Sequence, residues 1–221
     1  MGFDIHVLEN NYLLLLSGLG VTLYIATVSL AIGIVLGALA CLGKLSESGL
    51  SYRLANAFID FFRTVPEVVI IFWVYSCLPL LLDLRISPQI CGIISLSVFA
   101  GAFLAEIFRA GVLAVPRGQV EAAHALGLPI YYVWRHAIVP PAVRRMVPAF
   151  VNFLTEMLKI TSLLMAIGIG ELMYRANTLG AETYRFMELY TAAGIMYFAV
   201  IFPLSVYARR AERRRVQRTG N

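Results

Sequence analysis

The chain has 221 residues, of which 60% are hydrophobic and 14% are charged, and its formal net charge at pH 7 is +5. Soluble domains carry about a quarter charged residues, so this composition excludes an ordinary soluble enzyme and predicts an all-α membrane protein of one domain, 1–221. The basic residues gather in a central loop and in the C-terminal tail instead of covering a soluble face. This distribution predicts a lipid membrane around the chain and no nucleic-acid partner.

Apolar stretches predict about five transmembrane helices, because about 20 apolar residues cross a bilayer. Gly33 and Gly37 put small residues on one face of the first stretch, where another helix can approach closely. A polar segment, 168–188, precedes the last span and is expected outside the membrane or partly re-entrant. The five predicted spans lie within 10–43 and at about 54–82, 89–113, 147–167 and 189–208.

The segment 117–148, called the elbow below, is the longest stretch that cannot lie in lipid. Two short helices are predicted in it, about 120–126 and 130–138, with the second ending at Pro140-Pro141. Glu121 is expected in the first turn of the first helix, where a carboxylate interacts favourably with the helix dipole. Gly127 can take the left-handed conformation that ends a helix. A helix–glycine–helix arrangement at a membrane face suits docking into a groove of a partner.

The basic residues also predict the topology. Thirteen of them belong to the first loop, the elbow with its edge, and the tail 209–221, whereas only Arg85, Arg175 and Arg185 belong to the other side. Because cytoplasmic loops are enriched in Lys and Arg, the N terminus is predicted outside and the C terminus in the cytoplasm. The arginine-rich tail is interpreted as a topology anchor beside anionic lipid.

Three pairs of opposite charge lie in or near the predicted spans, and each pair is spaced i,i+3 on one helix face. One interpretation is that the pairs neutralise themselves and help the helix bundle to assemble. The other is that some of them line a polar path and contact a zwitterionic substrate, because ionisable residues in membranes usually face a bundle interior. Glu156 and Lys159 are the strongest candidates, with the hydroxyls of Thr161 and Ser162 one turn further on. The pairs are Asp60 and Arg63, Glu106 and Arg109, and Glu156 and Lys159.

No catalytic set is predicted, and no cofactor or metal ligands are expected in this chain. The glycine spacing of a phosphate loop is missing, so if the protein works by ATP, the ATP with its Mg²⁺ must bind to another subunit. The three histidines, His6, His124 and His136, show no metal-ligand grouping. The cysteines, Cys41, Cys77 and Cys91, stand singly in apolar stretches and are interpreted as small buried hydrophobic residues.

The elbow resembles the EAA loop of the membrane subunits of bacterial ABC importers. The resemblance rests on Glu121-Ala122-Ala123, on Gly127, and on Ile138-Val139-Pro140, with Ala137 and Val139 replacing the usual Ile and Leu. Flanking motifs look like those of polar amino-acid permeases, which carry substrates such as His, Glu, Gln, Arg or opines. These motifs are 105–111, 115–119, Thr161-Ser162-Leu163, Ile167-Gly168 and Glu171-Leu172. Two positions depart from the pattern: Val65 separates Arg63-Thr64 from Pro66, and Ile160 stands where relatives usually have Asp.

The resemblance implies the type I permease fold, with a core at about 18–208, in a bacterial inner membrane. It also implies two ATPase subunits, a second permease that is identical or homologous, and an extracytoplasmic binding protein. Glu121, Ala122, Ala123, Gly127 and Pro140 would then couple ATP hydrolysis to transport. Two alternatives stay open: a permease of the same architecture for another solute, such as an osmolyte, an opine or a peptide, and an ATP-independent carrier or channel.

Overall fold

A computed structural model describes residues 4–46 and 49–219, with side chains up to Arg210. Every regular element in these ranges is helical, which confirms the predicted all-α class. The elements are α1 (His6–Leu45), α2 (Gly49–Thr64), α3 (Glu67–Ser76), α4 (Leu78–Leu82), α5 (Pro88–Leu113), α6 (Arg117–Ala125), α7 (Ile130–Tyr132), a π-helix η1 (Val133–Ile138), α8 (Val139–Ile160), a 3-10 helix η2 (Thr161–Ile167), α9 (Leu172–Thr183) and α10 (Phe186–Thr219).

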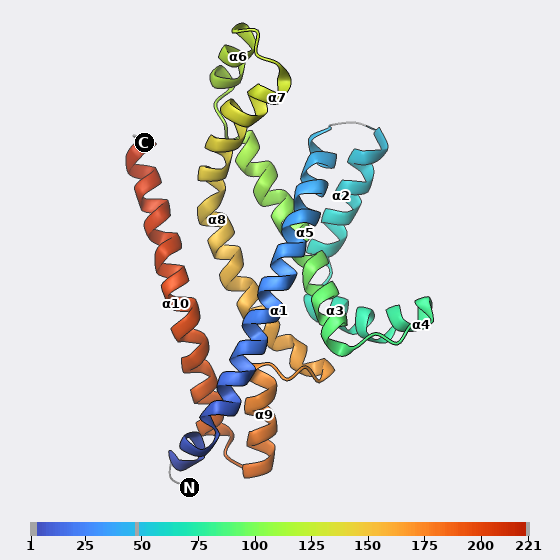
Figure 1. The fold of residues 1–221 in the computed structure, drawn as a ribbon, viewed down its shortest axis with the longest axis vertical. Helices are drawn as coiled ribbons and strands as arrows, with labels where there is room; N and C mark the ends of the chain where they lie inside the picture. The colour runs from blue at the N-terminus through green and yellow to red at the C-terminus, as the bar shows by residue number, and fades with distance from the viewer. Residues whose placement is uncertain (1–3, 47–48, 220–221) are drawn as a thin grey trace.

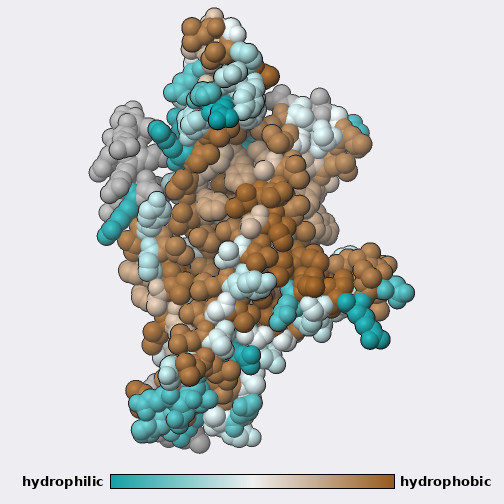
Figure 2. Space-filling view, in the orientation of Figure 1, coloured by the Kyte–Doolittle hydropathy of each residue, from teal (hydrophilic) through white to brown (hydrophobic). Residues whose placement is uncertain are grey.

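The long helices α1, α5, α8 and α10 run along the long axis of the molecule (Figure 1). The elbow helices α6 and α7 lie at the same end as the C terminus, and α9 lies with the N terminus at the opposite end. On the face shown in Figure 2, hydrophobic side chains fill the middle and hydrophilic ones gather toward both ends. Such a belt matches the hydrocarbon layer of a bilayer, which is about 30 Å thick.

Within the described ranges, four helical segments are long and apolar enough to cross a membrane, or five if a bent pair counts as one span. This agrees with the prediction of about five spans. Two segments are longer than predicted. The first is a single helix, α1, of 40 residues; at 1.5 Å per residue it is about 60 Å long, twice the hydrocarbon thickness. The fourth begins in the elbow and covers Ile130–Ile167.

The second predicted span, about 54–82, is present as a sharply bent pair of helices. Helix α2 ends at Thr64, and the chain bends by 105° before α3 and α4 continue. Pro66 lies at the bend with φ −57° and ψ 138°, an extended conformation. Proline has no N–H to continue a helix and also disfavours the helical conformation of the preceding residue, here Val65. As a result α3 and α4 leave the bundle sideways (Figure 1).

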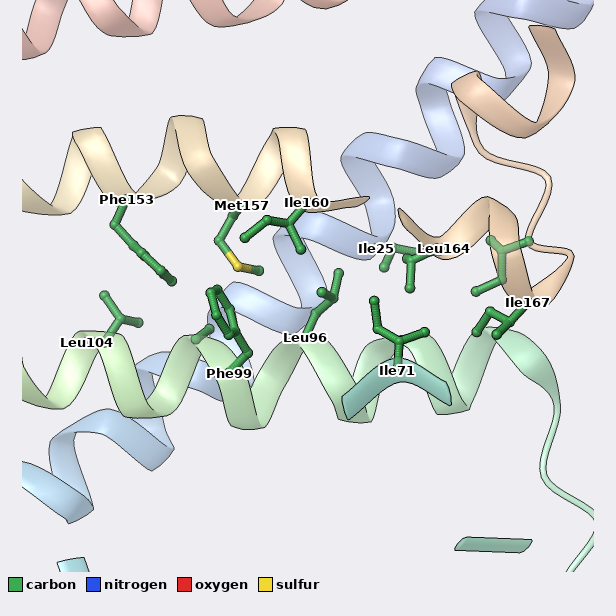
Figure 3. Packing of buried hydrophobic residues seen from close by; sticks show 12 residues of the cluster. Ile25, Ile71, Leu96, Phe99, Leu104, Phe153, Met157, Ile160, Leu164 and Ile167 are labelled. Atoms are coloured by element: carbon green, nitrogen blue, oxygen red, sulfur yellow. The ribbon is translucent and has the colours of Figure 1, made fainter. Parts of the chain in front are cut away.

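The main core lies between α1, α5 and α8. Side chains of α8 meet those of α5 and are joined by residues from α1, α3 and η2 (Figure 3). The labelled members are Ile25, Ile71, Leu96, Phe99, Leu104, Phe153, Met157, Ile160, Leu164 and Ile167. Cys41 and Cys91 are buried as predicted, whereas Cys77 is only partly buried.

The face of small residues predicted for the first span, which carries Gly33 and Gly37, is where α1 approaches α5. A side-chain carbon added at Gly33 would lie 2.5 Å from the Cβ of Ala100, and one added at Gly37 would lie 2.8 Å from the Cβ of Leu104. Both distances are shorter than non-bonded carbons tolerate. Helices of membrane proteins associate through such small-residue contacts, so these glycines let α1 and α5 pack closely.

Candidate functional site: the elbow and the polar face of α8

The first helix of the elbow begins about one turn earlier than predicted. Helix α6 starts at Arg117, after Pro116, so Glu121 lies in the second turn and not in the first. The helix-dipole argument for Glu121 is therefore wrong, because that effect is confined to the first turn. Glu121 and Ala122 are exposed, whereas Ala123 is buried in a small cluster with Val133, Ile138 and Ala142. One face of α6 thus packs against the neighbouring helices, and the face with Glu121 remains open.

Gly127 ends α6 in the predicted left-handed conformation, with φ +67°. The N–H of Gly127 donates to the carbonyl of His124 at 2.9 Å, and the N–H of Leu128 donates to that of Ala123 at 3.3 Å. This pair of bonds is the Schellman motif, which satisfies the last carbonyls of a helix. A Cβ at Gly127 would meet no atom within 4 Å. The requirement for glycine is therefore conformational and not steric.

The second elbow helix does not end at Pro140-Pro141, and that prediction is wrong. Helical structure continues from Ile130 through η1 and α8 to Ile160. Prolines cannot donate the usual i to i−4 hydrogen bonds. The π-helical turn η1 ends at Ile138, two residues before Pro140, and the N–H of Val139 donates to the carbonyl of Trp134, five residues back. The local change of helical pitch lets the helix pass through the two prolines, and Pro140 remains exposed.

The tip of the elbow exposes large apolar side chains at an end of the molecule that lies beyond the hydrophobic belt (Figures 1 and 2). Leu126 is 78% exposed, Ile130 62% and Tyr131 59%. The hydroxyl of Tyr131 accepts a hydrogen bond of 2.7 Å from Arg135. A contiguous exposed apolar patch rimmed by polar residues is typical of a protein-binding surface.

The three predicted charge pairs differ in their surroundings. Glu106 binds Arg109 at 2.9 Å and also Lys44 at 2.7 Å, so this cluster joins α1 to α5 and fits the interpretation of bundle assembly. Asp60 and Arg63 do not pair with each other. Asp60 accepts a hydrogen bond of 2.6 Å from Asn56, and the guanidinium of Arg63 lies 5.3 Å from the centre of the Phe103 ring.

The third pair lies on an open polar face of α8. Lys159 binds Glu156 at 2.5 Å, and their side chains are 55% and 52% exposed. Thr161 is fully buried, and its hydroxyl donates to the carbonyl of Leu158, so it does not reach this face. The hydroxyl of Ser162 donates to the carbonyl of Lys159. The face is marked by Arg145, Ala149, Asn152, Glu156 and Lys159, which repeat at three- and four-residue spacing.

A cavity of about 470 Å³ lies between α2, α5 and α8 at the elbow end of this face. Its charged lining residues are Arg63, Glu106 and Arg145, and Ala149 continues the lining along α8. The structure therefore brings Arg63 to the same side as the polar face of α8, although the two lie far apart in the sequence. Asp60 does not line this cavity.

Glu171 is a structural residue whose role the sequence did not reveal. It lies before α9, outside the candidate spans, and is fully buried. Its carboxylate accepts hydrogen bonds from the N–H groups of Met173 and Tyr174 and from the hydroxyl of Tyr197 on α10. Burial raises the pKa of this carboxyl above its usual value. Acidic N-caps are common, but only the fold shows that this one also binds a hydroxyl from α10.

The same combination of elbow and long helices occurs in known transport proteins. Residues 29–217 match the family described as "Binding-protein-dependent transport system inner membrane component". The chain belongs to this family. Because the family consists of membrane permease subunits, the protein is a transport subunit and not an enzyme. Within the described residues, no group of three or more His, Cys, Asp or Glu side chains could hold a metal ion.

Curated relatives and solved structures agree with this assignment. The chain is 35% identical to the arginine transport system permease protein ArtQ of Bacillus subtilis, over 90% of this chain and 91% of that protein. It is also 35% identical to the glutamine transport system permease protein GlnP of Escherichia coli K12, over 97% and 98% respectively. Among solved structures, an amino acid ABC transporter with histidines matches with a TM-score of 0.87 at 30% identity, covering 97% of this chain and all of the other.

A second structural match extends the fold assignment. A chain of the MetNI methionine ABC transporter, in an inward-facing conformation, matches with a TM-score of 0.74 at 23% identity, over 92% of this chain and 98% of that one. At this identity the likeness shows the fold alone. The type I ABC importer permease fold, expected from the EAA resemblance, is therefore confirmed.

Proposed function

We propose that this protein is the transmembrane subunit of an ABC importer that carries a polar amino acid or a close derivative across a bacterial inner membrane. The observation that carries the proposal is the elbow. Glu121 and Ala122 are exposed on α6, the helix ends at a left-handed Gly127, and large apolar residues surround this turn. This surface fits the groove of an ATPase subunit, which would bind the ATP and Mg²⁺.

The helical run from the elbow into the membrane supports a mechanism of coupling. The run Ile130–Ile167 begins beside the docking surface and includes Glu156 and Lys159. A movement of the elbow, driven by closure of two ATPase subunits, would therefore tilt α8 and its polar face as one body. Rocking of α8 against α5 would then open the path alternately to the two sides, as in other transporters whose bundles rock around a fixed site. In our proposal Pro140 belongs to the exposed coupling surface, and the buried Ala123 packs α6 against the start of this helical run, so that a movement of α6 is passed on.

A second permease subunit, identical or homologous, would complete the path. Glu156 and Lys159 are about half exposed on a helix that crosses the hydrophobic belt. Ionisable residues in membranes are costly unless they face a bundle interior or a water-filled cavity. A second subunit packed over this face would enclose them. The enclosed pair offers one cation and one anion, which suits a zwitterionic amino acid, with Arg63 and Ser162 as further polar groups beside the path.

The charges and the shape support the orientation that we propose. The adjoining ends of α1 and α2, the elbow helices and the C-terminal part of α10 lie toward one end of the molecule, and the N terminus lies at the other (Figure 1). Lys44 and Arg53 belong to these ends of α1 and α2. By the positive-inside rule the elbow end faces the cytoplasm. The C-terminal tail 209–221 belongs to this side; its side chains from 211 onward lie outside the described residues.

Reconstituted transport tests the proposal. The complex is purified through a tag on this chain, reconstituted with its binding protein in liposomes, and supplied with ATP and labelled amino acids. We expect ATP-dependent accumulation of a polar amino acid, with glutamine and arginine as the first substrates to test because they are named for the relatives. Accumulation that proceeds equally without ATP would contradict an importer and would support an ATP-independent carrier.

A further inference from the structure

The cavity of about 470 Å³ at the elbow end of the bundle has cationic side chains on two of its walls. Arg63 reaches it from α2 and Arg145 reaches it from α8, so two guanidinium groups from different helices line one space. The guanidinium of Arg63 lies 5.3 Å from the centre of the Phe103 ring, which lines the same cavity. This contact keeps the charged end of Arg63 beside the cavity.

The charges around the cavity favour an anion. Among the described residues that line it, Glu106 is the only acid. Both of its carboxylate oxygens are engaged elsewhere, because Oε1 lies 2.7 Å from Nζ of Lys44 and Oε2 lies 2.9 Å from Nη2 of Arg109. Neither of these two cations lines the cavity. No ion pair in the described part of the chain involves Arg63. Away from bulk water, an anion is strongly attracted to such cations.

The size and the lining of the cavity suit a small carboxylate. Apart from its charged residues the lining is apolar, and small residues such as Ala110 and Ala114 leave the space open. A side-chain carbon added at Gly111 would collide with Met146, so α5 and α8 touch at one wall. The volume falls within the range of about 300–1,000 Å³ that is common for small-molecule sites. Arginine presents a planar fork of donors that matches the two oxygens of a carboxylate. Two such forks around a space of this size fit the carboxylate end of an amino acid.

The cavity continues into the polar face of α8, and this continuity points to its occupant. Arg145 and Ala149 line the cavity and also belong to that face. Glu156 and Lys159 lie further along the same face. Arg145 and Glu156 are eleven residues apart, which is about 17 Å along an α-helix. One amino acid cannot span that distance, so the cavity is a site separate from the Glu156–Lys159 pair. A solute that moves along the face toward the elbow reaches the cavity last.

We propose that this cavity is an exit site, in which Arg63 and Arg145 bind the α-carboxylate of the imported amino acid before it enters the cytoplasm. The proposal rests on the proposed function, because it requires an amino acid on the polar face of α8 and an elbow end that faces the cytoplasm. All amino acids carry an α-carboxylate, so the exit site holds the substrate without selecting its side chain. Its two arginines belong to different helices, so rocking of α8 would change their separation and release the amino acid.

The test measures binding of labelled amino acids to the assembled importer in lipid nanodiscs, without binding protein and without ATP. The twenty protein amino acids are screened by equilibrium dialysis, and the one that binds most tightly is compared with its α-amide, which keeps the side chain but lacks the carboxylate. The variants are Arg63→Gln, Arg63→Lys and Arg145→Gln. Arg144→Gln is the matched control, because Arg144 is the exposed neighbour of Arg145 on α8 and does not line the cavity. Lys159→Gln tests the other cation of the polar face.

We expect the wild-type complex to bind the amino acid about tenfold more tightly than the α-amide, as is typical of a hydrogen bond between charged groups. This preference should largely disappear in Arg63→Gln and in Arg145→Gln, should be partly kept in Arg63→Lys, and should stay at the wild-type value in Arg144→Gln. A preference that survives in both Arg63→Gln and Arg145→Gln would overturn the assignment. So would an equal loss in Arg144→Gln, or a loss in Lys159→Gln alone, which would place the carboxylate at Lys159.

Nanodiscs of phosphatidylcholine, with and without phosphatidylglycerol, separate the amino acid from a lipid. If phosphatidylglycerol abolished amino-acid binding, and its own retention depended on Arg63 and Arg145, the cavity would hold a lipid phosphate and the proposal would be wrong. If no amino acid bound while the complex accumulated substrate with ATP and a binding protein, the exit site would be contradicted but the proposed function would stand. If the wild-type complex contained no ATPase subunit, the proposed function would fall and the exit site with it.

Discussion

Replacement of Gly127 tests the link between the shape of the elbow and coupling. With φ +67°, a residue that carries a Cβ is strained here, by about 1 kcal/mol for Ala and about 2 kcal/mol for a β-branched residue such as Val. Because a Cβ would meet no atom within 4 Å, no steric term is added. A difference of about 2 kcal/mol changes the equilibrium of the capped turn by about 30-fold.

The assay compares substrate accumulated with ATP hydrolysed in proteoliposomes. Gly127→Val should keep ATPase subunits bound but transport much less substrate per ATP than wild type, and Gly127→Ala should be intermediate. Gly127→Asn is the matched control, because Asn adopts the left-handed conformation more readily than other residues with a side chain. It should stay close to wild type. Full coupling in Gly127→Val, or equal loss in Gly127→Asn, would refute the reasoning.

Three further predictions concern the spans and their junction. Glu156→Gln should reduce the uptake rate while the assembled complex is recovered in normal yield; unchanged uptake kinetics would remove Glu156 from the path. Gly33→Leu should prevent stable packing of α1 on α5 and lower the melting temperature of the purified protein. Gly20→Leu is the control and should not lower it, because a Cβ at Gly20 meets nothing within 4 Å. Equal effects of the two substitutions would contradict the packing account. Burial raises the pKa of Glu171 above its usual 4.5, so the folded state binds the proton more tightly than the unfolded state and loses stability as pH rises from 4.5 through the raised pKa. Glu171→Gln should flatten that part of the curve of melting temperature against pH, and an unchanged curve would count against the assignment.

The sequence predicted the spans well where the physical signal is long and uniform. About 20 apolar residues are enough to indicate a membrane helix, so the first, third and last spans were found with small errors at their ends. The second span is found as well, but it is sharply bent at Pro66. The residues around Pro66 are compatible with either a kinked helix or a sharp bend. The direction of α3 after the proline depends on the helices against which it packs. Proline alone did not decide between them.

In the elbow, too, features set by neighbouring residues were predicted correctly, whereas features set by packing between helices were not. Gly127 was predicted correctly because a left-handed helix end depends on one residue and its neighbours. Pro140-Pro141 suggested a helix end for an equally local reason, but packing of Val133 and Ile138 on α6 and α8 stabilises a π-helical turn that carries the helix onward. The i,i+3 spacing likewise placed Asp60 and Arg63 on one face, yet Phe103 and Asn56 are better placed as their partners.

Two residues, Glu171 and Arg175, could not have been assigned from the sequence by physical reasoning. Their surroundings come from segments more than 20 residues away: Tyr197 for Glu171, and Gly18 for Arg175. An acidic residue before a helix and a basic residue within it are ordinary in isolation. Only the contacts among α1, α9 and α10 show that Glu171 is buried and links α9 to α10 through Tyr197. The same contacts bury Nε of Arg175, which has no hydrogen-bond partner within the described residues.

Recovery of an ATPase subunit with the purified protein tests the central claim most directly. The tagged chain is extracted from its native host in mild detergent, and the co-purifying proteins are identified and quantified for wild type, Glu121→Arg and Glu121→Gln. We predict an ABC ATPase in the wild-type eluate, a lower yield in Glu121→Gln, and loss of the ATPase in Glu121→Arg with normal amounts of the permease itself. An ATPase that is retained fully in Glu121→Arg would contradict docking at the elbow, and a wild-type eluate without any ATPase would contradict the importer.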